Sequence, residues 1–230
     1  MPPEAVSPGP RAVLLDVDGT LVDTVYVHTI CWEQALREHG HTVPMAQIHR
    51  SVGMGSDQLL DHLLGVDRDK GRDDSVVSAH DARFSGWYEQ VVPLLGAREL
   101  VRECARRDLL VVLASSGSAR DLEAMRAALD SDEHIAAVTT SADAEASKPA
   151  PDILAVALDR VGASAERAVF IGDAVWDVKA SSRVGLACIG LESGGTSAAE
   201  LMRAGAVETW RDPADLLANL DRSAVSRLLG

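Results

Sequence analysis

The stretch from residue 12 to residue 24, AVLLDVDGTLVDT, constrains the fold of this chain more than any other part. The apolar run at residues 12–15 predicts a buried strand, and Asp16 and Asp18 follow at its C-terminal end. Because side chains alternate along a strand, the two carboxylates would project to the same side. Two like charges held this close are costly unless a cation, or an anion with its metal, lies between them. The stretch therefore predicts a buried strand that ends in a functional site.

Gly19 and Thr20 come directly after this pair and predict a tight turn, which glycine permits. A single Asp-x-Asp at the end of a strand is usually only a polar turn. Here the whole pattern from Asp16 to Thr24, DVDGTLVDT, resembles the first motif of the haloacid dehalogenase superfamily of phosphotransferases. The resemblance predicts that three further motifs follow in order.

The composition is that of an ordinary globular protein, with 47% hydrophobic and 25% charged residues. A length of 230 residues is enough for an α/β core and a smaller insert. The net charge of −13 argues against nucleic acid or an anionic membrane as a partner. It would also repel a phosphorylated metabolite, so a metal and a few cationic side chains would have to reverse the field locally.

The three cysteines, Cys31, Cys104 and Cys188, have no paired spacing. We expect reduced, buried thiols in a cytoplasmic protein rather than disulfides or a zinc site. Residues 1–10 have neither a basic start nor an apolar run, so we expect a flexible tail and no signal peptide or anchor. No apolar window approaches the length needed to cross a bilayer.

Residues 24–91 contain helical patterns and no convincing strand. We expect helices from Asp23 or Thr24 to Gly40, and over 45–50, 56–64 and 74–91. An all-helical block placed straight after the first strand of an α/β protein predicts an insertion. We therefore expect a small helical cap at 24–91 over a Rossmann-like catalytic core made of 11–23 and 92–230.

Regular alternation of strands and helices begins after the helical block. Strands are expected at 109–114, 135–139, 168–171, 186–189 and 206–207, and helices at 97–107, 119–129, 150–161, 175–184, 198–204 and 213–220. Pro151 would lie in the first turn of the helix at 150–161. Alternation of this kind predicts a parallel sheet with helices on both faces.

Three later segments resemble the remaining motifs of the superfamily. Ser115 ends the hydrophobic strand VVLAS, Lys148 lies between prolines and small residues in ASKPAPD, and Asp173 and Asp177 form the GDxxxD pattern of VFIGDAVWD. Each feature alone has an ordinary structural explanation. Together they occur in the right order, each at or just after the carboxyl end of an apolar strand, where open α/β sheets build ligand sites. The resemblance covers about residues 12–189 and matches the capped branch of the superfamily.

The resemblance implies a phosphoryl-transfer site that uses Mg²⁺. Asp16 would be the nucleophile and Asp18 the general acid and base. Ser115, Ser116 and Lys148 would hold the phosphoryl oxygens. The metal ligands would be the Asp16 and Asp173 carboxylates and the Asp18 backbone carbonyl, with waters completing the set. Asp177 would be an outer ligand or orient Lys148, and Gly19 and Thr20 would support the loop.

The first hypothesis is a phosphatase that acts on a small phosphorylated metabolite. This phosphatase would resemble the phosphoglycolate phosphatase branch of the superfamily. A phosphomutase like β-phosphoglucomutase is the alternative, but that group usually has Glu-Asp where this chain has Gly172-Asp173. It also has a cap arginine at the place near Ser56, where this chain has none. Asp18 and Asp173 argue against a dehalogenase, which needs neither an acid/base carboxylate nor a metal. A catalytically silent binding module would typically have lost the nucleophile or a metal ligand, and this chain has a suitable residue at each of these positions.

The cap would select the substrate, and the turn VGMGSD at 52–57 is the expected contact region. His28, Arg50, Met54, Ser56 and Asp57 are candidates, although each alone is better explained as a packing or surface residue. The sequence leaves open the natural substrate, the pathway and the choice between a monomer and a homodimer.

Overall fold

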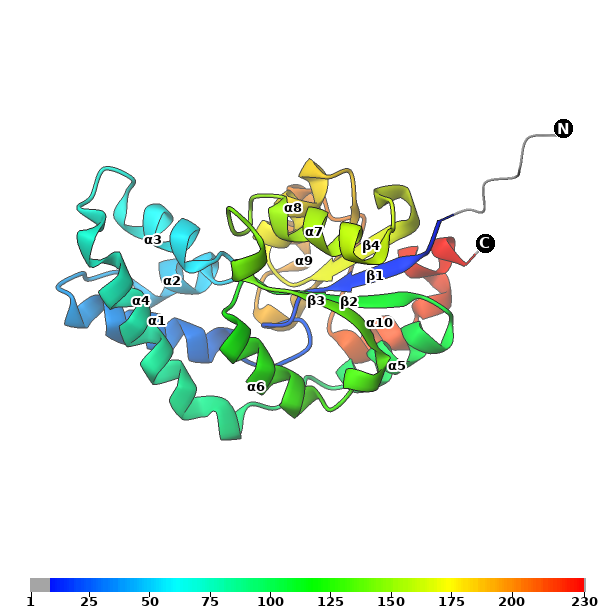
Figure 1. Ribbon diagram of the computed structural model, residues 1–230, viewed down its shortest axis with the longest axis horizontal. Helices are drawn as coiled ribbons and strands as arrows, with labels where there is room; N and C mark the ends of the chain where they lie inside the picture. Colours follow the sequence, from blue (N-terminus) through cyan, green and yellow to red (C-terminus); the bar gives the residue numbers. More distant parts are fainter. Residues whose placement is uncertain (1–8, 230) are drawn as a thin grey trace, which may run out of the picture.

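Six parallel strands form one sheet in the computed structural model, which describes residues 9–229 (Figure 1). Of the tail predicted at 1–10, residues 1–8 lie outside the described residues. The strands are β1 (Ala12–Leu15), β2 (Leu110–Ala114), β3 (Ile135–Thr139), β4 (Ala168–Gly172), β5 (Ala187–Leu191) and β6 (Glu208–Trp210). Their order is β3-β2-β1-β4-β5-β6, and Leu14 of β1 lies between Val112 and Phe170. The predicted Rossmann-like parallel sheet is confirmed.

Helices cover both faces of the sheet (Figure 1). On one face are α5 (Ala97–Arg106), α6 (Ala119–Leu129) and α10 (Pro213–Ala218), and on the other α7 (Asp152–Val161), α8 (Val175–Arg183) and α9 (Ala198–Ala204). Residues of β1 alternate between the two cores, since Val13 and Leu15 pack with the first group and Ala12 and Leu14 with the second. Both faces are buried, which explains why the strands read as continuous apolar runs.

Four helices follow the first motif and extend away from the sheet (Figure 1). They are α1 (Val25–Glu38), α2 (Met45–Ser51), α3 (Ser56–Leu64) and α4 (Asp73–Phe84), and they enclose a hydrophobic core of their own around Trp32, Leu36, Ile48 and Leu60. The chain enters and leaves this segment at adjacent points, because the Asp23 backbone N–H donates to the Val92 carbonyl at 3.0 Å. Two neighbouring connections therefore join the helices to the sheet.

The structure differs from the sequence prediction at several element ends. Thr24 occupies the N-cap position of α1, but its hydroxyl donates to Asp18 instead of capping the helix. Pro151 is the N-cap residue of α7 and not part of its first turn. The helix expected to reach residue 91 ends at Phe84 and continues as a 3₁₀ helix over Ser85–Gln90.

The last strand lies two residues later than predicted. The backbone N–H of Val207 donates to Cys188 at 2.8 Å, and the regular ladder then pairs Glu208–Trp210 with Ile189–Leu191. The apolar pair 206–207 connects α9 to the sheet. A prediction made from hydrophobicity alone therefore placed the strand too early. The 3₁₀ helices Leu220–Arg222 and Ala224–Leu228 were also not predicted, because they are short and gain stability from packing on the first core.

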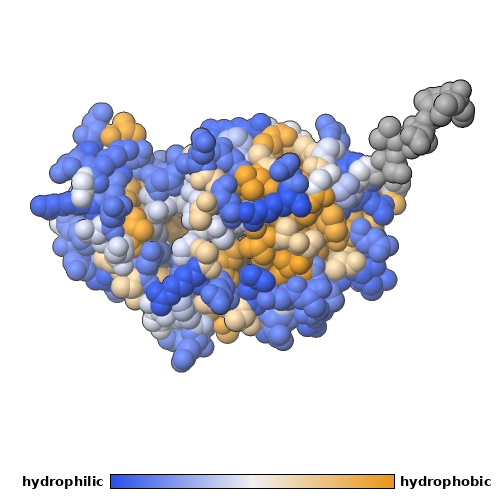
Figure 2. Space-filling view, viewed as in Figure 1, coloured by the Kyte–Doolittle hydropathy of each residue, from blue (hydrophilic) through white to orange (hydrophobic). Residues whose placement is uncertain are grey.

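Hydrophobic side chains gather on the α/β part in the space-filling view, whereas the segment of α1–α4 is mostly hydrophilic on this face (Figure 2). Within residues 9–229, no helix combines the length and the apolar character that a membrane span requires.

All three cysteines are free and buried, as predicted. Burial raises the pKa of Cys31 to about 11 and that of Cys104 to about 12. Since the thiolate is the reactive form, we expect native protein at pH 8 to react slowly with a thiol-specific disulfide reagent. Denatured protein should titrate three thiols at once. Rapid labelling of the native protein would contradict the buried placement.

Candidate active site

The carboxyl ends of the three central strands bring the first, second and fourth motifs together. Asp16 follows β1, Ser115 follows β2, and Asp173 follows β4. All three side chains are buried. Neighbouring parallel strands end at the same edge of a sheet, and ligand sites of open α/β sheets lie there. The backbone N–H groups of Asp16 and Ser115 donate to Ile171 and Thr139 respectively, which holds both residues in register with the adjoining strands.

Lys148 brings the third motif to the same point. Its side chain is fully buried, and its Nζ atom lies 2.5 Å from Asp16 Oδ1 and 3.0 Å from Asp177 Oδ1. Burial alone would lower the pKa of Lys148, but the two carboxylates raise it above its usual value, so the amine stays charged. A buried cation requires such partners, and Lys148 therefore ties the loop at 146–152 to the first and fourth motifs.

Three buried carboxylates converge beside this lysine. Oxygen atoms of Asp16, Asp173 and Asp177 all lie within 4.8 Å of one another. Burial and the neighbouring carboxylates raise the pKa of Asp16 to about 7, with Lys148 opposing them, and also raise the pKa of Asp173. A single lysine faces three acidic side chains, so the group has an excess of negative charge. Buried carboxylate oxygens with excess negative charge fit a hard divalent cation such as Mg²⁺.

Two glycines and a threonine shape this acidic group. Thr20 Oγ1 donates to Asp173 Oδ1 at 2.9 Å. A Cβ atom on Gly19 would lie 2.6 Å from Asp173 Oδ2, and the φ angle of Gly19 is +75°, so glycine is required there for both reasons. A Cβ atom on Gly194 would lie 1.7 Å from the same oxygen. Sequence analysis missed Gly194, because nothing in ESGGTS distinguishes it from an ordinary loop glycine.

Asp18 has different surroundings from Asp16. Its Oδ1 atom lies 2.9 Å from His28 Nε2 and accepts a hydrogen bond from Thr24 Oγ1 at 2.5 Å. Burial by itself would raise the pKa of Asp18, but the charge and hydrogen bond of His28, with Thr24 and Lys148, outweigh it and leave the pKa below its usual value. The two carboxylates of the first motif are therefore held in different electrostatic environments.

A chain of histidines leads from Asp18 into the helical segment. His28 Nδ1 lies 3.1 Å from His80 Nε2, and His80 Nδ1 lies 2.9 Å from Asp81 Oδ1. The His28 ring stacks on Phe84 with centroids 3.9 Å apart. Sequence analysis interpreted His28 as a packing or surface residue and did not consider His80. The spacing of 52 residues between the two histidines gives no local signal, so only the packing of α1 against α4 brings them together.

The turn after β2 presents a free hydroxyl. Ser115 Oγ accepts a hydrogen bond from the backbone N–H of Gly117 at 3.0 Å. Ser116 Oγ is buried and has no hydrogen-bond partner among the described residues. A buried hydroxyl without a partner is costly, which suits this atom to a ligand oxygen. Thus Ser116 lines the open site, while Ser115 and Lys148 lie beneath it.

A cavity of about 200 Å³ opens above Asp16 and Asp18 and extends to the helical segment. The turn predicted as the contact region reaches it, because Val52 to Ser56 line the wall together with His28. Asp57 instead accepts a hydrogen bond from the backbone N–H of Ser147 at 3.3 Å. Arg50 does not line this cavity and pairs with Glu200 at the surface.

Comparisons with known proteins agree with this arrangement. The family model described as haloacid dehalogenase-like hydrolase matches residues 10–185. A hydrolase from Pseudomonas syringae is similar in structure, with a TM-score of 0.89 and 32% sequence identity over 93% of this chain and 99% of that one. A protein named phosphoglycolate phosphatase from Photorhabdus laumondii subsp. laumondii is 27% identical over 81% of this chain and 82% of its own length.

A further relative is much longer than this chain. The chloroplastic protein SUPPRESSOR OF QUENCHING 1 of Arabidopsis thaliana is 30% identical over 190 residues, which are 79% of this chain and 18% of that protein. The similarity therefore concerns only one part of the plant protein.

Gly194→Ala tests the metal site without removing a ligand. The added methyl group has to displace the Asp173 carboxylate, since its Cβ atom would lie 1.7 Å from Oδ2. We expect Mg²⁺ affinity, measured by isothermal titration calorimetry, to fall about 10- to 100-fold. Gly86→Ala is the matched control, because no atom lies within 4 Å of the Cβ position there. Equal Mg²⁺ affinity in both variants would contradict a metal site at Asp173.

Proposed function

Because the chain belongs to the haloacid dehalogenase-like hydrolase family, we propose that it is a magnesium-dependent phosphatase of a small phosphorylated metabolite. The observation that carries the proposal is the buried contact between Lys148 Nζ and Asp16 Oδ1, with Asp173 and Asp177 beside it. This contact supports the proposed roles of Asp16 as nucleophile, of Lys148 as the cation for the phosphoryl oxygens and of the neighbouring carboxylates as metal ligands. The name phosphoglycolate phosphatase on a relative supports a phosphate ester as the substrate class.

In the proposed mechanism, Asp18 takes up a proton from the bound phosphomonoester monoanion. Asp16 then attacks phosphorus, the bond to the leaving oxygen breaks, and Asp18 gives that oxygen the proton. A water molecule then attacks the aspartyl phosphate, Asp18 takes its proton, and the bond between phosphorus and Asp16 breaks. Lys148 and the hydroxyls of Ser115 and Ser116 hold the phosphoryl oxygens in both steps. Mg²⁺, held by the carboxylates of Asp16 and Asp173 and the Asp18 carbonyl, would neutralise charge on the phosphoryl group.

The contacts of the two aspartates, rather than the directions of their pKa shifts, support these roles. Lys148 Nζ contacts Asp16 Oδ1 and thereby favours the ionised carboxylate that attack on phosphorus requires. Asp18 contacts His28, which positions its carboxylate toward the cavity and links it to the helical segment. Asp177 orients Lys148 through its 3.0 Å contact, and Thr20 orients Asp173. Each supporting residue thus fixes one reacting group.

We also propose that residues 24–91 act as a cap and that 11–23 with 92–230 form the catalytic core. The separate hydrophobic core of α1–α4 and the adjacent connections at Asp23 and Val92 support this division. A cap on two neighbouring connections could open for substrate entry and close for chemistry. A cytoplasmic location and a monomeric or homodimeric state remain part of the proposal.

The deciding experiment measures phosphate release from a panel of small phosphoesters, first with Mg²⁺ and then with a chelator. We expect metal-dependent release from the wild type and none above background from Asp16→Asn, which lacks the nucleophile. Asp23→Asn is the matched control, since Asp23 belongs to the same motif but its side chain is exposed. Conversion of β-glucose 1-phosphate to glucose 6-phosphate without phosphate release would favour the phosphomutase. Full activity of Asp16→Asn would refute both.

Asp18→Asn separates the acid and base role from metal binding. We expect turnover to fall about 10²- to 10⁴-fold, because the variant cannot exchange a proton with the leaving group or with water. Mg²⁺ affinity should stay within about twofold of the wild type, since the proposed metal contact uses the backbone carbonyl. A large loss of Mg²⁺ affinity in calorimetry would show that the Asp18 carboxylate itself binds the metal.

A further inference from the structure

The cavity above Asp16 has an apolar wall and an acidic rim. Trp32, Leu59 and Val77 from α1, α3 and α4 form the apolar part. Ser116, Ser118 and Ser141, which come from the sheet part of the chain, form another part of the lining. The organic part of a bound substrate would lie between these two parts of the lining, because its phosphate would be held below by Lys148 and by the metal that the carboxylate group would bind.

Two carboxylates line the same cavity away from the proposed metal site. Asp81 comes from α4, and its side chain is 46% exposed beside His80. Asp121 comes from α6, is buried, and accepts hydrogen bonds from Tyr88 Oη at 2.6 Å and Ser118 Oγ at 2.7 Å. The two acids therefore face the substrate space from the helical segment and from the core.

The histidines of the cavity do not offset these acids. Burial lowers the pKa of His80 despite its contact with Asp81, so this ring is neutral at pH 7. His28 is engaged with Asp18 at 2.9 Å. Any positive charge on His28 is therefore paired within the first motif.

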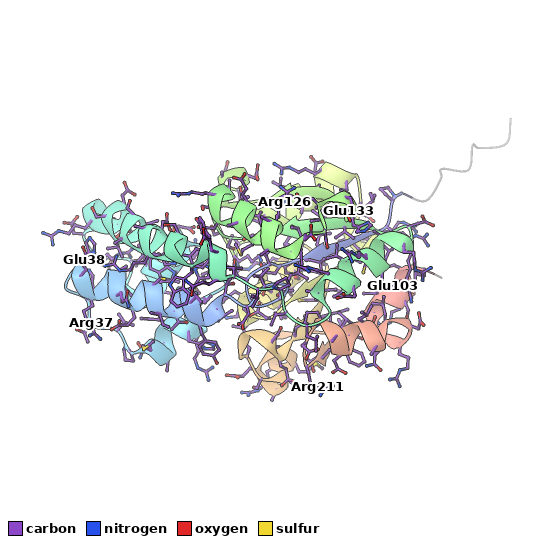
Figure 3. The ribbon with its side chains drawn as sticks, turned by 90° about the horizontal axis from the view of Figure 1, so that it is seen from below. Arg37, Glu38, Glu103, Arg126, Glu133 and Arg211 are labelled. Atoms are coloured by element: carbon purple, nitrogen blue, oxygen red, sulfur yellow. The ribbon has the colours of Figure 1, made fainter. Side chains whose placement is uncertain are left out.

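Among the described residues, no arginine or lysine offsets these acids from the cavity wall, and the Arg120 guanidinium lies over the Tyr88 ring, 5.8 Å from its centroid. None of the residues that line the cavity within 9–229 is an arginine or a lysine, and Lys148 is paired with Asp16 and Asp177. Figure 3 shows Arg37, Arg126 and Arg211 at the outer surface, where they pair with Glu33, Asp132 and Asp215. The substrate's organic part thus meets acidic, hydroxyl and apolar groups.

We infer, on the basis of the proposed phosphatase function, that the substrate is a phosphomonoester whose organic part is neutral or cationic and partly apolar. An anionic group would enter a confined space beside Asp81 and Asp121, where charge repulsion is only partly screened. We expect each such carboxylate to lower kcat/KM for an anionic substrate by about three- to tenfold. Phosphoglycolate, whose organic part is a carboxylate, is therefore a poor substrate of this chain, in contrast to the named relatives.

Three phosphomonoesters of nearly equal size test this inference in the wild-type protein with Mg²⁺. They are phosphoglycolate, 2-hydroxyethyl phosphate and phosphoethanolamine, which end in a carboxylate, a hydroxyl and an ammonium group. We expect kcat/KM for the neutral and cationic esters to exceed that for phosphoglycolate at least tenfold. Equal or faster hydrolysis of phosphoglycolate overturns the inference while leaving the phosphatase function intact. No phosphate release from these esters or from 4-nitrophenyl phosphate overturns the phosphatase function itself.

Asp81→Asn tests the electrostatic cause. The ratio of kcat/KM for phosphoglycolate to that for 2-hydroxyethyl phosphate should rise about three- to tenfold, because one repelling charge is removed. Using the ratio cancels any effect of the variant on the shared chemical step. Asp74→Asn, also on α4 but exposed and outside the cavity, should leave the ratio unchanged. An unchanged ratio in Asp81→Asn, or the same rise in Asp74→Asn, overturns the assigned role of the cavity charge.

Discussion

The excess of buried negative charge at the carboxyl edge of the sheet is the constraint on which the rest of the site depends. Asp16, Asp173 and Asp177 would repel one another if Lys148 did not lie among them. The lysine offsets only part of that charge, which is why the carboxylate group suits a divalent cation. Gly19 and Gly194 leave the Asp173 carboxylate the space it needs, so the loops around the site are adapted to the same group.

Several polar contacts join the segment of α1–α4 and its connections to the sheet part of the chain, and three of them involve the motif segments. The backbone N–H of Ser147 donates to Asp57, Trp176 Nε1 donates to the Arg50 carbonyl at 2.8 Å, and His28 contacts Asp18. These hydrogen bonds hold the segment of α1–α4 next to three parts of the site, namely the lysine loop, the helix of the fourth motif and the first motif. A change in the position of α1 or α4 would alter the surroundings of Asp18 directly.

The site divides into two parts that differ in charge. The lower part, around Lys148 and the three carboxylates, is built entirely from the core and suits a phosphoryl group with its metal. The upper part combines Asp81 of α4 with Asp121 of α6 and suits the organic group. In the proposed function the sheet part of the chain carries the chemistry, whereas α1–α4 contribute most of the apolar wall. Membership of the family therefore determines less about substrate choice than about reaction type.

The sequence by itself determined the parallel sheet, the helical insertion and the residues that follow the strand ends, because strand periodicity and local motifs depend on near neighbours. It placed β6 two residues early, since hydrophobicity does not specify where the ladder with β5 begins. Tertiary structure alone decided that His80 reaches His28, that Gly194 adjoins Asp173, and that Asp81 and Asp121 share a cavity. These residues are distant in the chain. Packing of α1 against α4 joins the two histidines, the loops after β4 and β5 bring Gly194 to Asp173, and packing of α4 near α6 lets Asp81 and Asp121 line one cavity.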